Sequence, residues 1–193
     1  MPLLTFDDPL PLSPRRVIVA GPSGSGKSTT AGLVARTLGI PHHELDALHH
    51  GPNWTPRPDF ERDVRRFAAR EGWVTEWQYP AVRELLLARA DLLIWLALPR
   101  RAVMRQVIAR TLRRRFRHEI LWNGNVEPPL RTILGDPQHV VRWSWTSYPK
   151  TPARMAAIVR DRPELPVVRL RSRREVTAWT AALSAHGSRP TPA

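Results

Sequence analysis

The sequence contains no cysteine among its 193 residues. This absence excludes a disulfide-stabilised scaffold, a thiol nucleophile and a zinc site with cysteine ligands. The longest apolar run, Leu92 to Leu98, is too short to cross a bilayer. The N-terminal segment carries Asp7 and Asp8 where a signal peptide would carry positive charge. We therefore expect a cytoplasmic protein with no membrane partner.

Lysine is also scarce, because all of the 30 basic residues except Lys27 and Lys150 are arginine. Such a bias usually reflects a GC-rich coding sequence, so much of the arginine content is background. The net charge of +13 still favours an anionic partner, whether a nucleotide, a nucleic acid or an anionic lipid surface. Each lysine that remains against this background is informative about function.

Short β-branched or apolar runs alternate along the chain with segments of helical periodicity. This alternation predicts an α/β fold in which a five-stranded parallel sheet is covered by helices on both faces. The expected strands are residues 15–20, 43–45, 73–76, 91–98 and 166–170. The expected helices include residues 27–38, 60–70, 81–88, 100–117 and 175–183.

Composition also indicates how the chain is organised. Residues 1–14 are rich in proline and are expected to be a flexible leader. Residues 15–186 are expected to form a single domain, in which residues from about 100 to 136 make a small helical lid. Residues 187–193 are expected to be a disordered tail.

Residues 21–28 match the G-x-x-x-x-G-K-[ST] pattern and lie between a predicted strand and a predicted helix. Glycines let backbone N–H groups surround a polyphosphate, and the helix N-terminus adds about half a positive charge. Lys27 is expected to reach the β- and γ-phosphates, and the Ser28 hydroxyl is expected to ligate Mg²⁺. The pattern therefore predicts a site for ATP and Mg²⁺. The expected nucleotide-binding residues of this segment are Gly21, Ser23, Gly24, Ser25, Gly26, Lys27, Ser28 and Thr29.

Two classes of NTPase are disfavoured by motifs that the sequence lacks. A GTPase would need an Asn/Thr-Lys-x-Asp motif, but Lys150 is followed by Thr-Pro-Ala. A larger motor ATPase usually has a hydrophobic strand ending in Asp-Glu, whereas Leu98 is followed by Pro99. Nucleotide-kinase-like proteins tolerate this lack because their carboxylates come from other strands.

Two carboxylates are candidates for catalysis, since ligands of parallel sheets lie at the carboxyl ends of the strands. Asp46 follows the second expected strand, and a carboxylate beside a γ-phosphate can orient a hydroxyl and accept its proton. The alternative for Asp46 is a helix-capping or ion-paired role. Glu76 ends the third expected strand and is assigned the same role, with a structural ion pair to an arginine as its alternative.

Paired histidines at residues 42–43 and 49–50 suggest a metal site. On a strand, however, the rings of His42 and His43 would point to opposite faces, and no third clustered carboxylate completes a tetrahedral shell. We therefore expect that these histidines bind no metal. His49 is a candidate to contact the acceptor. Trp54 and Trp77 are candidates to line the acceptor pocket, although packing is the more frequent role of tryptophan.

The segment from Arg100 to Glu119 is the densest run of arginine in the chain. Residues on one helical face are expected to pack: Met104, Ile108, Leu112 and Phe116. Residues on nearly the opposite face are expected to bind phosphate: Arg110, Arg113, Arg114 and Arg117. Arg110 and Arg114 are expected to complete the catalytic site when the lid closes. The alternatives are a solvated cationic face and a nucleic-acid groove.

Several segments together resemble the adenylate-kinase-like P-loop proteins often labelled DNA topology modulation proteins. These segments are residues 21–29, 45–49 (Leu-Asp-Ala-Leu-His), 51–54 (Gly-Pro-Asn-Trp), 73–74 and 89–100. The resemblance covers residues 15 to about 125 and implies a P-loop NTPase fold, an ATP site and mobile segments over an acceptor. It also implies that the loop after the last strand holds the adenine ring, which makes Arg171 a candidate to stack on the base.

One departure from the family concerns the end of the third strand. The family commonly has Asp-Gly-Asn-Tyr, whereas this chain has Glu76-Trp77-Gln78-Tyr79. Glu76 can supply the same carboxylate one methylene further out, but loss of the glycine changes how closely a ligand can approach. We therefore expect a different choice of substrate.

The sequence predicts an ATP-dependent kinase that transfers the γ-phosphate to an unidentified small molecule or nucleotide. The alternative is an ATP-binding or ATP-hydrolysing regulatory protein that acts on DNA or on a protein partner. The sequence does not favour nucleic acid as the partner, because it contains no recognition motif and the arginines concentrate in the expected lid.

Overall fold

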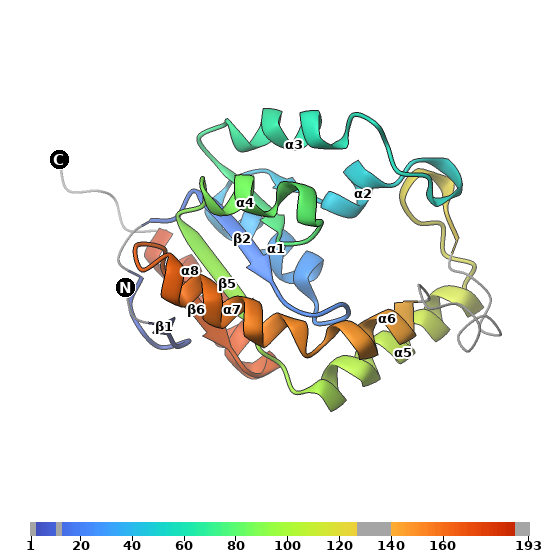
Figure 1. The fold of residues 1–193 in the computed structure, drawn as a ribbon. Coiled ribbons are helices and arrows are strands. Elements are labelled where there is room, and N and C mark those ends of the chain that lie inside the picture. The colour runs from blue at the N-terminus through green and yellow to red at the C-terminus, as the bar shows by residue number, and fades with distance from the viewer. Residues whose placement is uncertain (1–2, 11–12, 127–139, 188–193) are drawn as a thin grey trace.

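The computed structural model describes residues 3–10, 13–126 and 140–187, with the backbone alone for 184–187. A parallel sheet runs through the middle of the fold, with strand order β1-β6-β5-β2-β4-β3 (Figure 1). Its strands are β1 (Leu3–Leu4), β2 (Arg16–Ala20), β3 (His42–His43), β4 (Trp73–Glu76), β5 (Leu92–Leu96) and β6 (Val167–Leu170). This architecture confirms the predicted α/β class.

The sheet has six strands rather than the five that the sequence predicts. The additional strand is β1, in which Leu3 pairs with Val167 and Leu4 with Val168. It lies within the segment expected to be a flexible leader. A strand of two residues is too short to show periodicity in the sequence. It is held in place by pairing with the otherwise free edge of β6.

Helices cover both faces of the sheet (Figure 1). Their bounds are α1 (Lys27–Leu38), α2 (Leu45–His49), α3 (Phe60–Ala68), α4 (Pro80–Leu87), α5 (Arg100–Phe116), α6 (Val140–Ser147), α7 (Lys150–Asp161) and α8 (Arg173–Gly187). Side chains alternate along β2, so Val17 and Val19 join the core with α1 and α8, whereas Ile18 joins the core with α3, α4 and α7. None of the helices in the described ranges has the length and apolar character needed to cross a bilayer.

The second strand is shorter than the sequence predicts, and this changes the position of Asp46. Strand β3 ends at His43, and Leu45 already begins α2, so Asp46 lies in the first turn of a helix rather than at a strand end. The Leu45 N–H donates to Glu76 Oε2 at 3.1 Å. This long-range hydrogen bond satisfies an otherwise unpaired amide at the start of α2.

The prediction for the packing face of α5 is wrong. The residues buried on this helix are Val103, Val107 and Thr111, whereas Ile108 is 44% and Phe116 is 76% exposed. The buried face packs against the phosphate loop and α6. Residues 127–136 of the expected lid and 188–193 of the expected tail lie outside the described part of the chain.

Two short 3₁₀ turns complete the described structure: η1 (Pro52–Trp54) follows α2, and η2 (Trp122–Gly124) follows α5. They are about seventy positions apart in the sequence but contact each other in space. Their contact joins the segment after the C-terminal end of α5 to the segment after α2. Both turns contribute a residue to one end of a cavity between these elements.

Candidate active site

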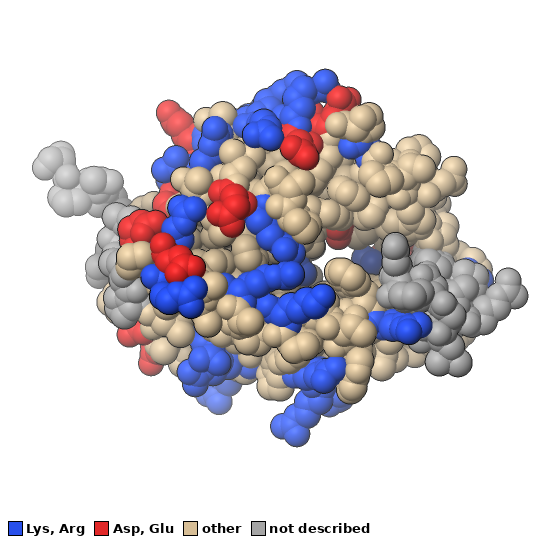
Figure 2. Space-filling view, in the orientation of Figure 1, with Lys and Arg blue, Asp and Glu red and all other residues tan. Residues whose placement is uncertain are grey.

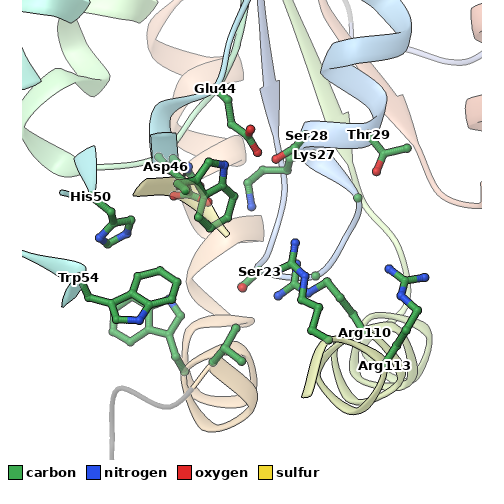
Figure 3. Close-up of a pocket in the computed structure, with 17 residues that line it drawn as sticks. Ser23, Lys27, Ser28, Thr29, Glu44, Asp46, His50, Trp54, Arg110 and Arg113 are labelled. Atoms are coloured by element: carbon green, nitrogen blue, oxygen red, sulfur yellow. Dashed lines mark hydrogen bonds between the residues drawn. The ribbon is translucent and has the colours of Figure 1, made fainter. Parts of the chain in front are cut away.

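A cavity of about 610 Å³ lies among the phosphate loop, α2 and α5 (Figure 3). In the space-filling view the surface is hollowed in this region, and Lys and Arg side chains gather beside the hollow (Figure 2). The lining residues are Ser23, Gly24, Gly26, Lys27, Ser28, Thr29, Glu44, Asp46, His50, Trp54, Gln78, Arg110, Arg113, Arg114, Trp122, Val140 and Trp143. A volume of this size suits a small molecule.

The phosphate loop connects β2 to α1, as the sequence predicts. Gly24 and Gly26 have φ values of +81° and +92°, a left-handed conformation that favours glycine. A Cβ on Gly24 would lie 2.0 Å from Val107 Cγ2, so glycine also lets α5 approach the loop. Of the predicted loop residues, Gly21 and Ser25 do not line the cavity, and Ser25 is buried.

Lys27 begins α1 and extends into the cavity (Figure 3). Its Nζ donates to the carbonyl of Pro22 at 3.3 Å. Burial lowers the pKa of Lys27, and Arg110 lowers it further, whereas Asp46 and Glu76 act in the opposite direction. A desolvated ammonium group of this kind is stabilised when an anion binds beside it.

Asp46 lies in the same cavity, and one of its carboxylate oxygens is held by two donors. Oδ1 accepts hydrogen bonds from Gln78 Nε2 at 2.8 Å and from the Tyr79 hydroxyl at 2.5 Å. Within the described residues, Oδ2 has no hydrogen-bond partner. The carboxylate is therefore fixed through one oxygen and can accept a proton or a hydroxyl contact through the other.

Tyr79 keeps the tyrosine of the pattern from which residues 76–78 depart. Burial, followed by the charge of Asp46, raises the pKa of Tyr79, so its hydroxyl remains protonated and donates. Its backbone φ of +58° is uncommon for a residue with a side chain. The hydroxyl also lies 3.1 Å from His50 Nε2, and the ring stacks on His49 with centroids 4.1 Å apart.

Glu76 is fully buried and does not line the cavity. It accepts hydrogen bonds from the Leu45 amide and from His42 Nε2, both at 3.1 Å. Its ion-pair partner is therefore a histidine, and not the arginine that the sequence suggests. Burial alone would raise the pKa of Glu76, but hydrogen bonds and the charge of His42 hold it below its usual value.

Glu44 immediately precedes α2 and lines the cavity, although it is not among the residues predicted from the sequence. Figure 3 shows its carboxylate directed toward Ser28. Across the described ranges, no group of three or more acidic or histidine side chains could hold a metal ion. Mg²⁺ usually takes one or two carboxylates together with substrate phosphates, and Ser28 with Glu44 fits that requirement. The Glu-x-Asp spacing of residues 44 and 46 was the available signal.

Three of the four predicted phosphate-binding arginines of α5 line the cavity: Arg110, Arg113 and Arg114. Figure 3 shows Arg110 extending from α5 toward Ser23 and Lys27. Arg117 is exposed and lies outside the lining, as does Arg171, whose backbone N–H donates to Glu175 Oε2 at 2.8 Å.

Aromatic side chains form another part of the lining, and only Trp54 was among the predicted residues. His50, Trp122 and Trp143 also line the cavity. By contrast, Trp77 is buried in the core, with the Arg83 guanidinium 5.0 Å from its ring centre.

Comparison with known proteins identifies a fold but no sequence family. No protein-family model matches the chain, and no curated protein is similar to it in sequence. A shikimate kinase from Acinetobacter baumannii, solved in complex with shikimate, matches with a TM-score of 0.51 and 13% identity over 88% of this chain and 90% of its own. A gluconokinase from Sinorhizobium meliloti 1021 gives a TM-score of 0.43 and 23% identity, with coverages of 90% and 95%. A sugar kinase from Janibacter sp. HTCC2649 gives 0.45 and 19%, with coverages of 96% and 92%.

These comparisons do not show the resemblance to DNA topology modulation proteins, which stays a prediction from the sequence. The match to the A. baumannii structure spans most of both chains and supports the fold alone. The chain therefore has the α/β fold of P-loop kinases, with six strands in its sheet.

Proposed function

We propose that this protein is an ATP- and Mg²⁺-dependent phosphotransferase that acts on a hydroxyl group of a small molecule. The observation that carries the proposal is the placement of Lys27 and Arg110 in the same cavity as Asp46, whose Oδ2 has no partner in the described part of the chain. Cations suited to a triphosphate thus lie close to a carboxylate suited to an acceptor hydroxyl.

In the proposed reaction, the acceptor hydroxyl binds between Asp46 Oδ2 and the γ-phosphate. Its oxygen forms a bond to phosphorus while its proton passes to Asp46, and the bond from phosphorus to the β–γ bridging oxygen breaks to release ADP. Lys27 and Arg110 compensate the negative charge on the phosphates as this bond breaks. Gln78 and Tyr79 keep Asp46 Oδ1 fixed, so the carboxylate needs no reorientation during transfer.

The remaining predicted residues are assigned supporting roles. Backbone amides of residues 23–29 would hold the phosphates, and Ser28 with Glu44 would hold Mg²⁺. That ion would supply charge neutralisation at the β- and γ-oxygens. Arg114 would assist Arg110, and Arg171 keeps its proposed place at the adenine ring. Glu76 would position α2, and through it Asp46, rather than contact the substrate.

The second candidate function is an ATP-dependent regulatory protein that acts on DNA or on a protein partner. The net charge of +13 favours it. However, three arginines of α5 line the same cavity as Lys27 and Asp46, whose size suits a small ligand. A small-molecule phosphotransferase accounts for these residues better.

The test is an ADP-release assay with ATP, Mg²⁺ and a panel of hydroxylated acceptors. We expect at least one acceptor to raise turnover above water-only hydrolysis, and Lys27→Ala and Asp46→Asn to remove that increase. Lys150→Ala is the matched control, because it removes the only other lysine, which is exposed and outside the cavity. Turnover that no acceptor raises, together with ATP-insensitive and salt-sensitive duplex binding, would support the regulatory alternative instead.

A further inference from the structure

Two loops with the same backbone conformation face each other at one end of the cavity. We call residues 51–56 the first loop and residues 121–126 the second loop. Asn53 (φ 55°, ψ 34°) and Asn123 (φ 54°, ψ 35°) occupy equivalent positions in them. In each loop the first N–H donates to the fifth carbonyl at 2.7 Å, and an antiparallel bridge flanks the turn. One side chain of the second loop joins the two loops.

That side chain is Asn125, which is 4% exposed. Its Nδ2 donates to the carbonyls of Gly51 at 2.9 Å and Trp122 at 2.8 Å, and its Oδ1 accepts the N–H of Trp54 at 2.8 Å. Asparagine can donate two protons and accept at one oxygen, and all of these capacities are used here. No other residue type of similar size satisfies the same three backbone groups.

The joined loops present two indole rings to the cavity. The rings of Trp54 and Trp122 lie edge-to-face, with centroids 6.3 Å apart and planes at 76°. Trp54 Nε1 already donates to the carbonyl of Val126 at 3.2 Å. Trp54 therefore offers a ligand the face of its ring rather than a hydrogen-bond donor. Figure 3 shows Trp54 and His50 on the same side of the cavity as Asp46, across from Ser23 and Lys27.

Building on the proposed phosphotransfer, we propose that the two loops form the wall of the acceptor site, against which a ring of the acceptor stacks. Asn125 is the positioning residue that holds both indoles in that wall. An aromatic face recognises a flat ring or the C–H face of a cyclic sugar, while Asp46 and Gln78 supply polar contacts at one end. The acceptor is therefore a hydroxylated ring compound, either a nucleoside or a cyclic sugar.

The first experiment measures ADP release with adenosine, thymidine, D-glucose and the acyclic polyol D-sorbitol. We expect one of the two ring classes to raise turnover at least about tenfold above water-only hydrolysis and sorbitol to have no effect. The responding compound identifies the source of the ring. Equal stimulation by sorbitol, or no stimulation by any ring compound, would overturn the proposal.

The second experiment tests the wall residues with the responding ring compound. Trp122→Ala and Asn125→Ala should raise its KM about tenfold or more, while the KM for ATP changes by less than about twofold. Thr55→Val is the matched control, because Thr55 has the position in the first loop that Asn125 has in the second. Its hydroxyl bonds only within its own loop, to the Pro52 carbonyl at 2.7 Å. An unchanged acceptor KM in Asn125→Ala would contradict the assignment.

Hydrogen exchange provides a readout that needs no acceptor. The Trp54 amide is bonded to Asn125 Oδ1, so Asn125→Ala should increase its exchange rate at least about tenfold, whereas Thr55→Val should not. Binding of a non-hydrolysable ATP analogue, measured by calorimetry, separates the two proposals. If the analogue binds in a Lys27-dependent way but Trp122→Ala and Asn125→Ala change neither the acceptor KM nor the exchange rate, only the proposal for the wall is refuted. If the analogue does not bind at all, the proposed phosphotransferase function is refuted.

Discussion

The hydroxyl of Tyr79 lies 2.5 Å from Asp46 Oδ1, which makes it the closest donor to the carboxylate that we propose as the catalytic base. The same oxygen accepts a hydrogen bond from Gln78, which stands where the proteins that the sequence resembles commonly have asparagine. One of the two donors to the acceptor carboxylate therefore lies at a position that departs from their pattern.

We predict that Tyr79→Phe lowers kcat for phosphotransfer roughly tenfold to hundredfold, because a hydrogen bond to a charged group contributes about 1.5–3 kcal/mol. The KM for ATP should stay within about twofold. Steady-state kinetics with a responding acceptor provide the measurement. Tyr148→Phe is the control, since the chain's other tyrosine loses a comparable bond to the Leu98 carbonyl. Equal losses in the two variants would argue against a role at Asp46.

Arg110 provides a second test, because it enters the cavity from α5 and acts electrostatically on Lys27. We predict that Arg110→Ala lowers kcat on the order of 10³-fold, as expected for an arginine that stabilises a transferring phosphoryl group. Arg105→Ala removes the same charge from an exposed position of the same helix and should have little effect. Similar rates for both variants would indicate that only the net charge of α5 matters.

The pairing of Glu76 with His42 makes stability depend on pH. Because the pKa of Glu76 is below its usual value of 4.5, this carboxylate stabilises the fold above that pH. Its contribution is lost as the pH falls through the lower folded-state pKa. We predict that Glu76→Gln lowers the free energy of unfolding at pH 7 by about 1–3 kcal/mol and flattens the acid limb of the stability curve. Chemical denaturation between pH 7 and pH 3 measures both effects.

The control for this prediction is Glu61→Gln, which removes an exposed carboxylate paired with Arg65 one helical turn away. Exposed pairs contribute little, so its stability curve should follow that of the wild type. If Glu76→Gln and wild type lose stability in parallel below pH 4.5, the pairing with His42 does not contribute as described.

The contact between Gly24 and Val107 predicts a steric effect. Gly24→Ala places a methyl group 2.0 Å from Val107 Cγ2, so we expect a lower Tm and weaker binding of an ATP analogue. Gly39→Ala is the control, because Gly39 also has positive φ (+64°) but no atom lies near its Cβ position. Adding Val107→Ala to Gly24→Ala should restore part of the lost binding. No rescue would mean that backbone strain, rather than α5, causes the defect.

The features that the sequence predicted are those encoded in short, continuous patterns. The phosphate loop, the alternation of strands and helices, and the presence of Asp46 in the cavity all follow from local spacing. The packing face of α5 did not, because Val107 and Ile108 are adjacent and both apolar. The close approach of the phosphate loop at Gly24 and the packing of α6 bury Val107 and leave Ile108 exposed.

Most of the residues proposed to bind the acceptor could not be predicted from the sequence, for a different reason. Trp54 and Trp122 come together through Asn125, and the hydrogen bonds that join them span about seventy positions. Local periodicity in the sequence does not predict a contact between segments so far apart. The start of α2 likewise depends on Glu76, a residue of a neighbouring strand.

The two edges of the sheet are formed by β1 and β3, each only two residues long. A long free edge exposes a row of unpaired amides and carbonyls to which a second chain can add a strand. Here β1 and β3 leave almost no such row, and they cover part of the edges of β6 and β4, which would otherwise be the outermost strands. The leucines at the start of the chain thus protect the solubility of the sheet as well as its packing.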